Sequence, residues 1–380
     1  MIASACGPRD AMIISRTPFR ISFFGGGTDY PAWYARHGGA VLATTIDKYC
    51  WITCRYLPPF FEHRHKVVYS QIEYPNTVDE IDHPAVREVF RFCGVSRGVA
   101  IQHDGDLPSR SGMGSSSAFT VGLLNALHAL NGKMPSRHQL AMESIRIEQE
   151  ILREVVGSQD QVLAAYGGLS HVIFHANGEI TVRPVTAPPH RIQELHSHLM
   201  LFYTGIRRTA ATVAKTYLDN IDKHRWQLRV MERMVSEGLD ILCGTGDLRA
   251  FGELLHEAWL SKRSLSESVS NPTVDLLYER ARAAGAIGAK ITGAGGGGFL
   301  LVFAPPARHD DVREELNDLI HVPFKFESNG SQIVFFDREQ DYTAADDARS
   351  QQKLRPFVEL ASSAPAAARS RGEDGGGGGT

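Results

Sequence analysis

The feature that most constrains this chain is a loop rich in glycine and serine that joins an expected strand to an expected helix. The loop reads LPSRSGMGSSSA over residues 107–118. An apolar run at 99–103 precedes it, and residues 115–130 contain few charges, which predicts a buried helix. Glycines let a ligand approach the backbone, and a helix start offers unpaired N–H groups and a positive dipole end. These properties predict a polyphosphate cradle, although a serine-capped helix after a flexible loop has the same composition.

Two other functional motifs do not fit this loop. A Walker A loop needs a lysine before its serine or threonine, and none is present. A nucleophile elbow needs a glycine to close G-x-S-x-G, where this chain has Ser117-Ala118. The hydroxyls of Ser115, Ser116 and Ser117 are available instead to cap the helix, contact phosphate or bind Mg²⁺.

Two further segments are rich in glycine. Residues 293–298 read GAGGGG and match G-x-G-x-x-G, but they lie between two expected strands, so the context of a dinucleotide-binding loop is missing. Such a loop is either a flat backbone surface that presses on a ligand or another loop, or a mobile hairpin. Residues 25–29 read GGGTD and follow an apolar strand. Asp29 there either accepts hydrogen bonds from two hydroxyls of a polyol or caps a turn.

Length and composition are those of an ordinary globular protein with two domains. The chain has 380 residues, of which 43% are hydrophobic and 22% charged. A formal net charge of −3 gives no reason to expect nucleic acid or an acidic membrane as a partner. No window is apolar for long enough to span a bilayer, and the N-terminus lacks the apolar core of a signal peptide. We therefore expect a cytoplasmic protein.

The cysteines also indicate a reducing compartment. There are five, and an odd, scattered set in a long chain argues against a disulfide framework. Cys50 and Cys54 lie in an alternating apolar stretch, which predicts two buried strand thiols, with a metal-binding pair as the alternative.

Strands and helices mix along the chain, which predicts an α+β fold in two parts. A proline-containing break at 186–189 marks the expected boundary between domains at 12–188 and 189–345. We expect a flexible N-terminus at 1–11, with Met12 as an alternative start, and a tail at 346–380 that is largely disordered from about 362. The expected strands span 20–24, 41–55, 99–103, 169–174, 180–185, 199–203, 289–292 and 299–303, and the expected helices span 115–130, 137–156, 210–235, 247–262 and 273–284.

The three glycine segments, in this order, resemble those of the GHMP kinases. Residues 108–116 match the phosphate loop P-x-x-x-G-L-G-S-S-A of that family, with Met113 in place of leucine, and residues 293–298 match its C-terminal glycine loop. The resemblance covers roughly residues 16–335. It implies the GHMP kinase fold, with an N-terminal α/β domain of the ribosomal-protein-S5 type and a C-terminal ferredoxin-like α+β domain. The implied ATP-binding residues are Pro108, Ser111, Gly112, Met113, Gly114, Ser115, Ser116 and Ser117.

The resemblance also implies roles for acidic residues that would otherwise be read as caps or surface charges. Asp160 lies in a G-x-x-D segment where the family has its catalytic carboxylate, and Arg20 aligns with an arginine near that group. Ser116 and Glu148 match the family's Mg²⁺-linked serine and glutamate, with Glu150 close enough in sequence to compete for that role.

The N-terminal segment separates the subfamilies. Galactokinases read G-R-V-N-L-I-G-E-H-T-D-Y there, whereas this chain reads FRISFFGGGTDY over residues 19–30. Gly26-Gly27 replace the Glu-His pair that grips galactose. Together with TIDKY at 45–49 and YTGIRR at 203–208, this form looks most like the D-glycero-D-manno-heptose 7-phosphate 1-kinases, with L-fucokinase domains as the nearest rival. The implied substrate-binding residues are Gly26, Gly27, Thr28, Asp29, Gly295, Gly296 and Gly297, with Arg16, Arg208 and Lys290 expected to meet the substrate phosphate.

The resemblance therefore implies a kinase that uses ATP and Mg²⁺ to phosphorylate the anomeric hydroxyl of a sugar phosphate. The implied product is heptose 1,7-bisphosphate, for nucleotide-activated heptose and surface glycan synthesis. The alternatives are a fucokinase- or galactokinase-like kinase of a free sugar, a kinase of a non-sugar such as mevalonate, and a non-catalytic binding protein on the same fold. The only expected partner is the small-molecule substrate, with no nucleic acid and no membrane, and the oligomeric state is left open.

Overall fold

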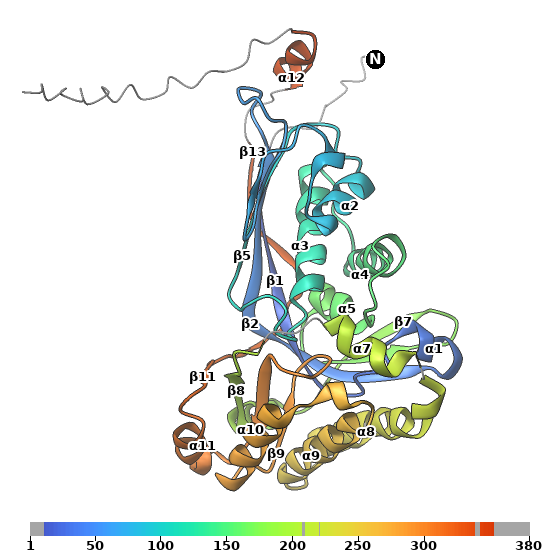
Figure 1. Ribbon diagram of the computed structural model, residues 1–380, viewed down its shortest axis with the longest axis vertical. Coiled ribbons are helices and arrows are strands. Elements are labelled where there is room, and N and C mark those ends of the chain that lie inside the picture. Colours follow the sequence, from blue (N-terminus) through green and yellow to red (C-terminus); the bar gives the residue numbers. More distant parts are fainter. Residues whose placement is uncertain (1–10, 207–209, 220, 339–342, 353–380) are drawn as a thin grey trace, which may run out of the picture.

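The structure is a computed structural model that describes residues 11–206, 210–219, 221–338 and 343–352. It is elongated: a tall sheet, covered on one face by helices, stands on a broader base that contains a second sheet (Figure 1). The expected flexible N-terminus, apart from Ala11, and the tail beyond residue 352 lie outside the described residues.

The first sheet contains nine described strands built around two long antiparallel strands. Its main path runs β13-β1-β2-β5-β3-β4, while β6 and β12 also pair with β2, and β7 pairs with β6. The strands are β1 (Ala11–Phe24), β2 (Gly39–Tyr56), β3 (Lys66–Val68), β4 (Ile72–Glu73), β5 (Val99–Gly105), β6 (Ser170–Phe174), β7 (Ile180–Pro184), β12 (Phe326–Glu327) and β13 (Gln332–Arg338).

The second sheet has the order β11-β8-β10-β9 among the described strands. Its members are β8 (Leu199–Tyr203), β9 (Gly288–Ile291), β10 (Phe299–Phe303) and β11 (Ile320–His321). The helices are α1 (Pro31–His37), α2 (Pro84–Cys93), α3 (Ser115–Leu130), α4 (Arg137–Ile145), α5 (Gln159–Tyr166), α6 (Pro189–His198), α7 (Ala210–Leu218), α8 (Arg225–Cys243), α9 (Arg249–Arg263), α10 (Pro272–Ala283), α11 (His309–Glu315) and α12 (Thr343–Ser350).

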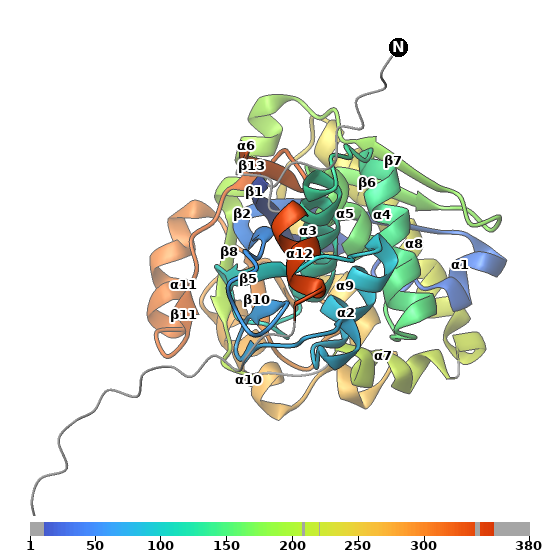
Figure 2. The same ribbon diagram turned by 90° about the horizontal axis from the view of Figure 1, so that it is seen from above.

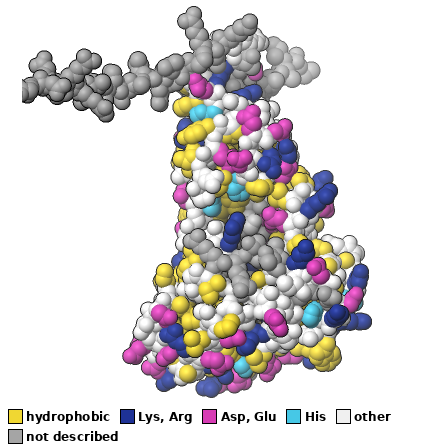
Figure 3. Space-filling view, in the orientation of Figure 1, with side chains coloured by type: hydrophobic (Ala, Val, Ile, Leu, Met, Phe, Trp, Pro, Cys, Tyr) yellow, Lys and Arg dark blue, Asp and Glu magenta, His cyan; other side chains and the backbone are white. Residues whose placement is uncertain are grey.

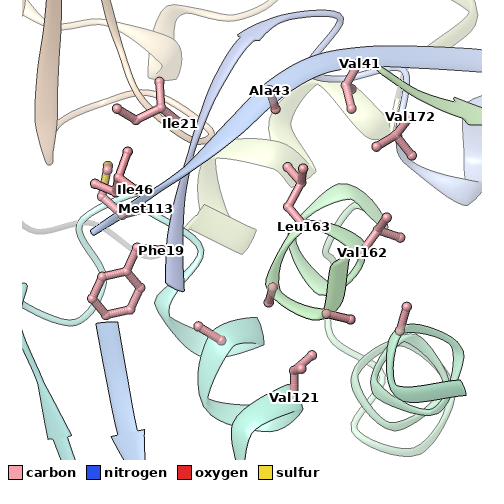
Figure 4. Packing of buried hydrophobic residues seen from close by; sticks show 14 of the residues in the cluster. Phe19, Ile21, Val41, Ala43, Ile46, Met113, Val121, Val162, Leu163 and Val172 are labelled. Carbon is pink, nitrogen blue, oxygen red and sulfur yellow. The ribbon is translucent and has the colours of Figure 1, made fainter. Parts of the chain in front are cut away.

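The helix after the phosphate-like loop packs tightly against the first sheet. Ser15 Oγ donates to Gly122 O across 2.9 Å, and a Cβ at Gly122 would lie 2.8 Å from Thr17 Oγ1. Glycine at this position therefore lets α3 approach β1 closely. Val121 of α3 and Leu163 of α5 extend the same core (Figure 4), and α2, α3 and α4 cover this face of the sheet (Figures 1 and 2).

Three sequence expectations are modified by the fold. The single helix expected at 210–235 is divided into α7, which ends at Leu218, and α8, which begins at Arg225. The helix expected at 137–156 ends as an α-helix at Ile145 and continues as a π-helical turn, Arg146–Ile151. The chain also returns to the first sheet after the second, because β12 pairs with β2 and β13 with β1. The division at residue 188 therefore stays a prediction, since the segment after it contributes strands to both sheets.

The cysteines and the surface charges are placed as follows. Cys50 and Cys54 are buried free thiols on β2, and burial raises the pKa of both, so they stay protonated. Acidic and basic side chains are interspersed on the face shown in Figure 3. No helix in the described part of the chain has the length and apolarity that crossing a membrane requires.

Candidate active site

The two glycine loops touch each other backbone to backbone. Gly112 has a φ of +80°, and a Cβ there would lie 2.7 Å from Thr292 O. A Cβ at Gly293 would lie 2.7 Å from Gly112 Cα, and one at Gly298 would lie 2.1 Å from Ser111 O. Side chains are therefore excluded on both sides of this contact between the two loops, which we call the glycine seam. Of the two readings of residues 293–298, the backbone surface pressed against another loop is the observed one.

An arginine–aspartate pair lies directly beside this seam. Arg20, on β1, is only 5% exposed, and its Nε and Nη2 each donate to one oxygen of Asp160 across 2.7 Å. Its Nη1 donates to Gly112 O across 2.6 Å. Since Asp160 is in the first turn of α5, one guanidinium joins the sheet, that helix and the phosphate-like loop. The two predicted catalytic residues are thus in contact.

A second carboxylate is buried next to this pair. Asp29 accepts hydrogen bonds from the Gly27 amide at 2.8 Å and from Gln159 Nε2 at 2.9 Å. A Cβ at Gly157 would lie 1.9 Å from Asp29 Oδ2, so glycine there gives the carboxylate its space. Burial raises the pKa of Asp29, and the negative charge of Asp160 raises it further.

The neighbouring glycine turn has a different role at each residue. The Thr28 hydroxyl lies within hydrogen-bond distance of Gly25 O and Ala40 O and accepts from the Ala40 amide, so it fixes the turn. Its contact with substrate stays a prediction. A Cβ at Gly26 would meet nothing closer than 3.6 Å, and Gly27 lies beside Leu228 of α8. Of the predicted polyol group, Gly26 therefore has open space beside its backbone, whereas Asp29 is a buried acceptor that already has two protein donors.

The predicted metal-binding glutamate, Glu148, belongs to the π-helical turn and is buried beside the start of α3. Glu148 is 1% exposed, and its Oε2 accepts from Ser117 Oγ at 2.9 Å and from Gln161 Nε2 at 2.5 Å. Within the described residues its Oε1 is buried without a hydrogen-bond partner. Burial raises the pKa of Glu148 to about 7, against the lowering effect of its hydrogen bonds.

The surroundings of Glu148 fit a hard cation, but the serine that contacts this glutamate differs from the predicted one. A buried carboxylate oxygen without a partner is a suitable ligand for Mg²⁺, which keeps most of its other positions for water and phosphate. The described residues hold no cluster of three or more His, Cys, Asp or Glu side chains that could bind a metal alone. Ser117 rather than Ser116 contacts Glu148, whereas Ser116 is exposed at the helix start. The exposed Glu150 lies 3.6 Å from Arg146 instead.

The residues expected to meet a substrate phosphate are not brought together. Lys290 is buried, and its Nζ donates to Ser22 O at 3.0 Å and Phe23 O at 2.7 Å, so it supports the backbone of β1. Arg16 stacks over the Tyr49 ring and donates to Gln332 Oε1, away from the glycine seam. Arg208 lies outside the described residues.

Other loop residues make protein contacts. Ser111 Oγ donates to Pro108 O at 2.6 Å, which closes the loop on itself, and Arg20 N donates to Met113 O at 3.1 Å. In the second loop, Gly296 N donates to Val269 O, while Gly295 and Gly297 lie against Val269 and Ile206. The close neighbours of Gly295, Gly296 and Gly297 are thus protein atoms, and their contact with substrate stays a prediction.

Sequence reasoning missed three polar residues here. Gln159 and Gln161 hold the two buried carboxylates, and their place beside Asp160 in the G-x-x-D segment was the available signal. Lys262 is 6% exposed near the end of α9, and its Nζ donates to Gly293 O. A single lysine in an amphipathic helix gives no signal in the sequence.

Comparisons with known proteins agree on one family. Residues 78–168 match the family model "GHMP kinases N terminal domain", and residues 240–321 match "GHMP kinases C terminal". The D-glycero-alpha-D-manno-heptose 7-phosphate kinase of Campylobacter jejuni is 26% identical over 313 residues, which cover 78% of this chain and 90% of that protein. The galactokinase of a Roseiflexus species is 26% identical, with 81% of this chain and 88% of that protein covered.

Solved structures give the same fold. A D-glycero-D-manno-heptose 1-phosphate kinase from Bacteroides thetaiotaomicron superposes with a TM-score of 0.70 at 23% identity, covering 84% of this chain and 98% of that one. The predicted fold class is therefore confirmed.

Proposed function

The chain belongs to the GHMP kinase family and is a sugar kinase, and from this premise we propose that it phosphorylates the anomeric hydroxyl of D-glycero-D-manno-heptose 7-phosphate with ATP. The observation that carries the chemical part is the fork between Arg20 and Asp160 beside the Gly112 loop. It places a carboxylate and a cation at the start of the helix whose amides would hold the donor phosphates.

The residues divide the reaction between them. The amides of the loop from Gly112 to Ser117 hold the ATP phosphates at the start of α3. Mg²⁺, held by Glu148 and Ser116, would supply charge neutralisation on the phosphates. Each Asp160 oxygen accepts one bond from Arg20 and keeps a second lone pair, which can take the proton of the acceptor hydroxyl. The deprotonated hydroxyl oxygen of the sugar then bonds to the γ-phosphorus as the bond between that phosphorus and ADP breaks.

The acceptor is assigned from the turn at residues 25–29. Gly26 leaves room where a galactokinase has a polar side chain, and the buried Asp29 can accept a hydroxyl hydrogen bond. The similarity to a heptose 7-phosphate kinase supports the phosphorylated heptose as acceptor. The product is the 1,7-bisphosphate, made in the cytoplasm as a precursor of activated heptose.

A panel of acceptors tests this assignment. ADP release is measured with MgATP and heptose 7-phosphate, the free heptose, galactose, L-fucose or mevalonate. We expect kcat/KM for heptose 7-phosphate to exceed that for each other acceptor by at least about 10²-fold, because a site built for a polar group rejects analogues that lack it. Better use of free fucose or galactose would refute the heptose assignment and leave the kinase assignment intact.

The two serines at the start of α3 make separable predictions. Ser116→Ala should raise the Mg²⁺ concentration for half-maximal activity by about tenfold, because it removes a proposed ligand. Ser117→Ala should instead lower the free energy of unfolding by about 1 kcal/mol, because it removes the buried hydrogen bond to Glu148. Mg²⁺ titrations and thermal melts of both variants measure this. If only Ser117→Ala changed the Mg²⁺ requirement, the ligand would be Ser117.

A further inference from the structure

Two lysines are buried next to the glycine seam, and they differ in what they face. Lys290 donates two hydrogen bonds to carbonyls of β1 and so has a supporting role. Lys262 donates to the carbonyl of Gly293, at the start of the second glycine loop. Neither forms an ion pair within 4.0 Å among the described residues, although both are at most 6% exposed.

Lys262 and Arg20 hold the two sides of the seam in the same way. Arg20 donates to Gly112 O in the first loop, and Lys262 donates to Gly293 O in the second. The backbones of Gly112 and Gly293 are in contact. The two cations therefore lie on either side of the place where the loops meet, one from β1 and one from the last turn of α9.

The charged groups near Lys262 include Arg20 and Asp160, which have roles in the proposed reaction. The positive charge of Arg20 disfavours its protonated form, while the negative charges of Asp29 and Asp160 favour it. The first glycine loop contains no lysine, so the phosphates held there meet no ammonium group from their own loop. The ammonium group of Lys262 has three N–H donors, and one of them donates to Gly293 O.

We propose that Lys262 is a second cationic group of the active site, which faces the phosphoryl group during its transfer and supplies the charge that a lysine in the phosphate loop provides in other kinases. This inference rests on the proposed kinase function. Preorganised positive charge in a site that excludes water stabilises the charge of the transferred group. The α9 lysine is thus a catalytic residue from the second half of the chain, opposite Arg20 and Asp160 from the first.

The protonation of Lys262 gives the proposal a pH signature. Burial lowers its pKa from 10.5 to about 8, with Arg20 as the next cause. The charged groups that face it are Arg20 on β1, Asp29 after β1, Asp160 on α5 and Lys290 on β9. Because only the ammonium form carries the charge, kcat should decline as the pH rises through about 8.

Three variants test the proposal with whichever acceptor of the panel is turned over, so that the wrong choice of sugar does not decide it. Lys262→Met keeps the length and apolar stem without the charge. Lys262→Arg keeps a charge that is not lost below pH 12. Lys325→Met removes an exposed lysine as the matched control.

We expect Lys262→Met to lower kcat by about 10²–10³-fold per folded molecule, with KM for ATP changed less than about threefold. Its residual rate should lack the decline above pH 8, and Lys262→Arg should also lack it. Lys325→Met should resemble the unaltered protein. A kcat within about threefold of normal in Lys262→Met, or the same alkaline decline in that variant, would overturn the proposal. A lowered melting temperature with normal kcat per folded molecule would assign Lys262 a structural role only.

Discussion

Replacing Asp160 by asparagine should lower kcat by about 10²–10⁴-fold, the range expected when a positioned general base is removed. Asparagine has nearly the same volume and can accept one of the two hydrogen bonds from Arg20. Its amide cannot take a proton from the acceptor hydroxyl. The Arg20 bond to Gly112 O does not involve Asp160, so the loop proposed to hold ATP should keep its shape.

Steady-state kinetics with both substrates varied measure this effect. KM for ATP should change less than about threefold, since the loss is confined to the transition state. Asp106→Asn is the control, because Asp106 accepts hydrogen bonds from Tyr49 N and Trp51 Nε1 on the sheet and lies outside the proposed chemistry. A near-normal kcat in Asp160→Asn would show that the carboxylate only holds Arg20 in place.

Replacing Glu148 by glutamine should abolish most of the activity and stabilise the metal-free protein. The pKa of Glu148 is about 7 in the folded protein and 4.5 ordinarily. Between these values the folded protein holds a proton that the unfolded chain releases, so stability falls as the pH rises through this window. Above pH 7 the loss is complete. Glutamine cannot ionise, so at pH 8 the variant should gain roughly 1–3 kcal/mol in the free energy of unfolding.

Thermal melts at pH 5 and pH 8, without Mg²⁺ and with excess Mg²⁺, test this prediction. The stabilising effect of the substitution should be present at pH 8 and small at pH 5. The stabilising effect should be smaller when Mg²⁺ and ATP are present, because the cation then neutralises the negative charge of the original glutamate. Glu150→Gln, on the same π-helical turn but exposed, is the matched control and should leave stability and kcat nearly unchanged. If Glu148→Gln destabilised the protein at pH 8, the claim that the buried charge of Glu148 lowers stability would be wrong.

Much of the fold could be predicted because apolar periodicity is a local property. Residues 115–130 and 299–303 form the expected helix and strand with the same bounds. The helix expected at 137–156 was too long. A π-helical turn shifts the hydrogen bonding by one residue, as in Leu152 N to Ile147 O, and leaves the apolar pattern of the sequence unchanged. The return of β12 and β13 to the first sheet is a long-range pairing without a local signal.

The residues of the site differ in the same way: some have a local signal in the sequence and others do not. Glycines at 112 and 293 could be singled out because a positive φ and a close backbone contact leave a visible trace in the sequence. The pairing of Arg20 with Asp160 came from the resemblance, since 140 residues separate them. Lys262 could not be found, because nothing local distinguishes a buried lysine from a surface one. Arg16 and Lys290 lie near the motifs in sequence, but Arg16 bonds to Gln332 and Lys290 bonds to the backbone of β1.

The most direct test is a ³¹P NMR spectrum of a single turnover, with excess enzyme, MgATP and D-glycero-D-manno-heptose 7-phosphate. We expect the γ-phosphate signal to be replaced by that of a phosphate on the anomeric carbon, while the 7-phosphate signal persists and ADP forms in equal amount. Formation of ADP with inorganic phosphate alone would contradict this expectation, as would phosphorylation at a position other than the anomeric carbon.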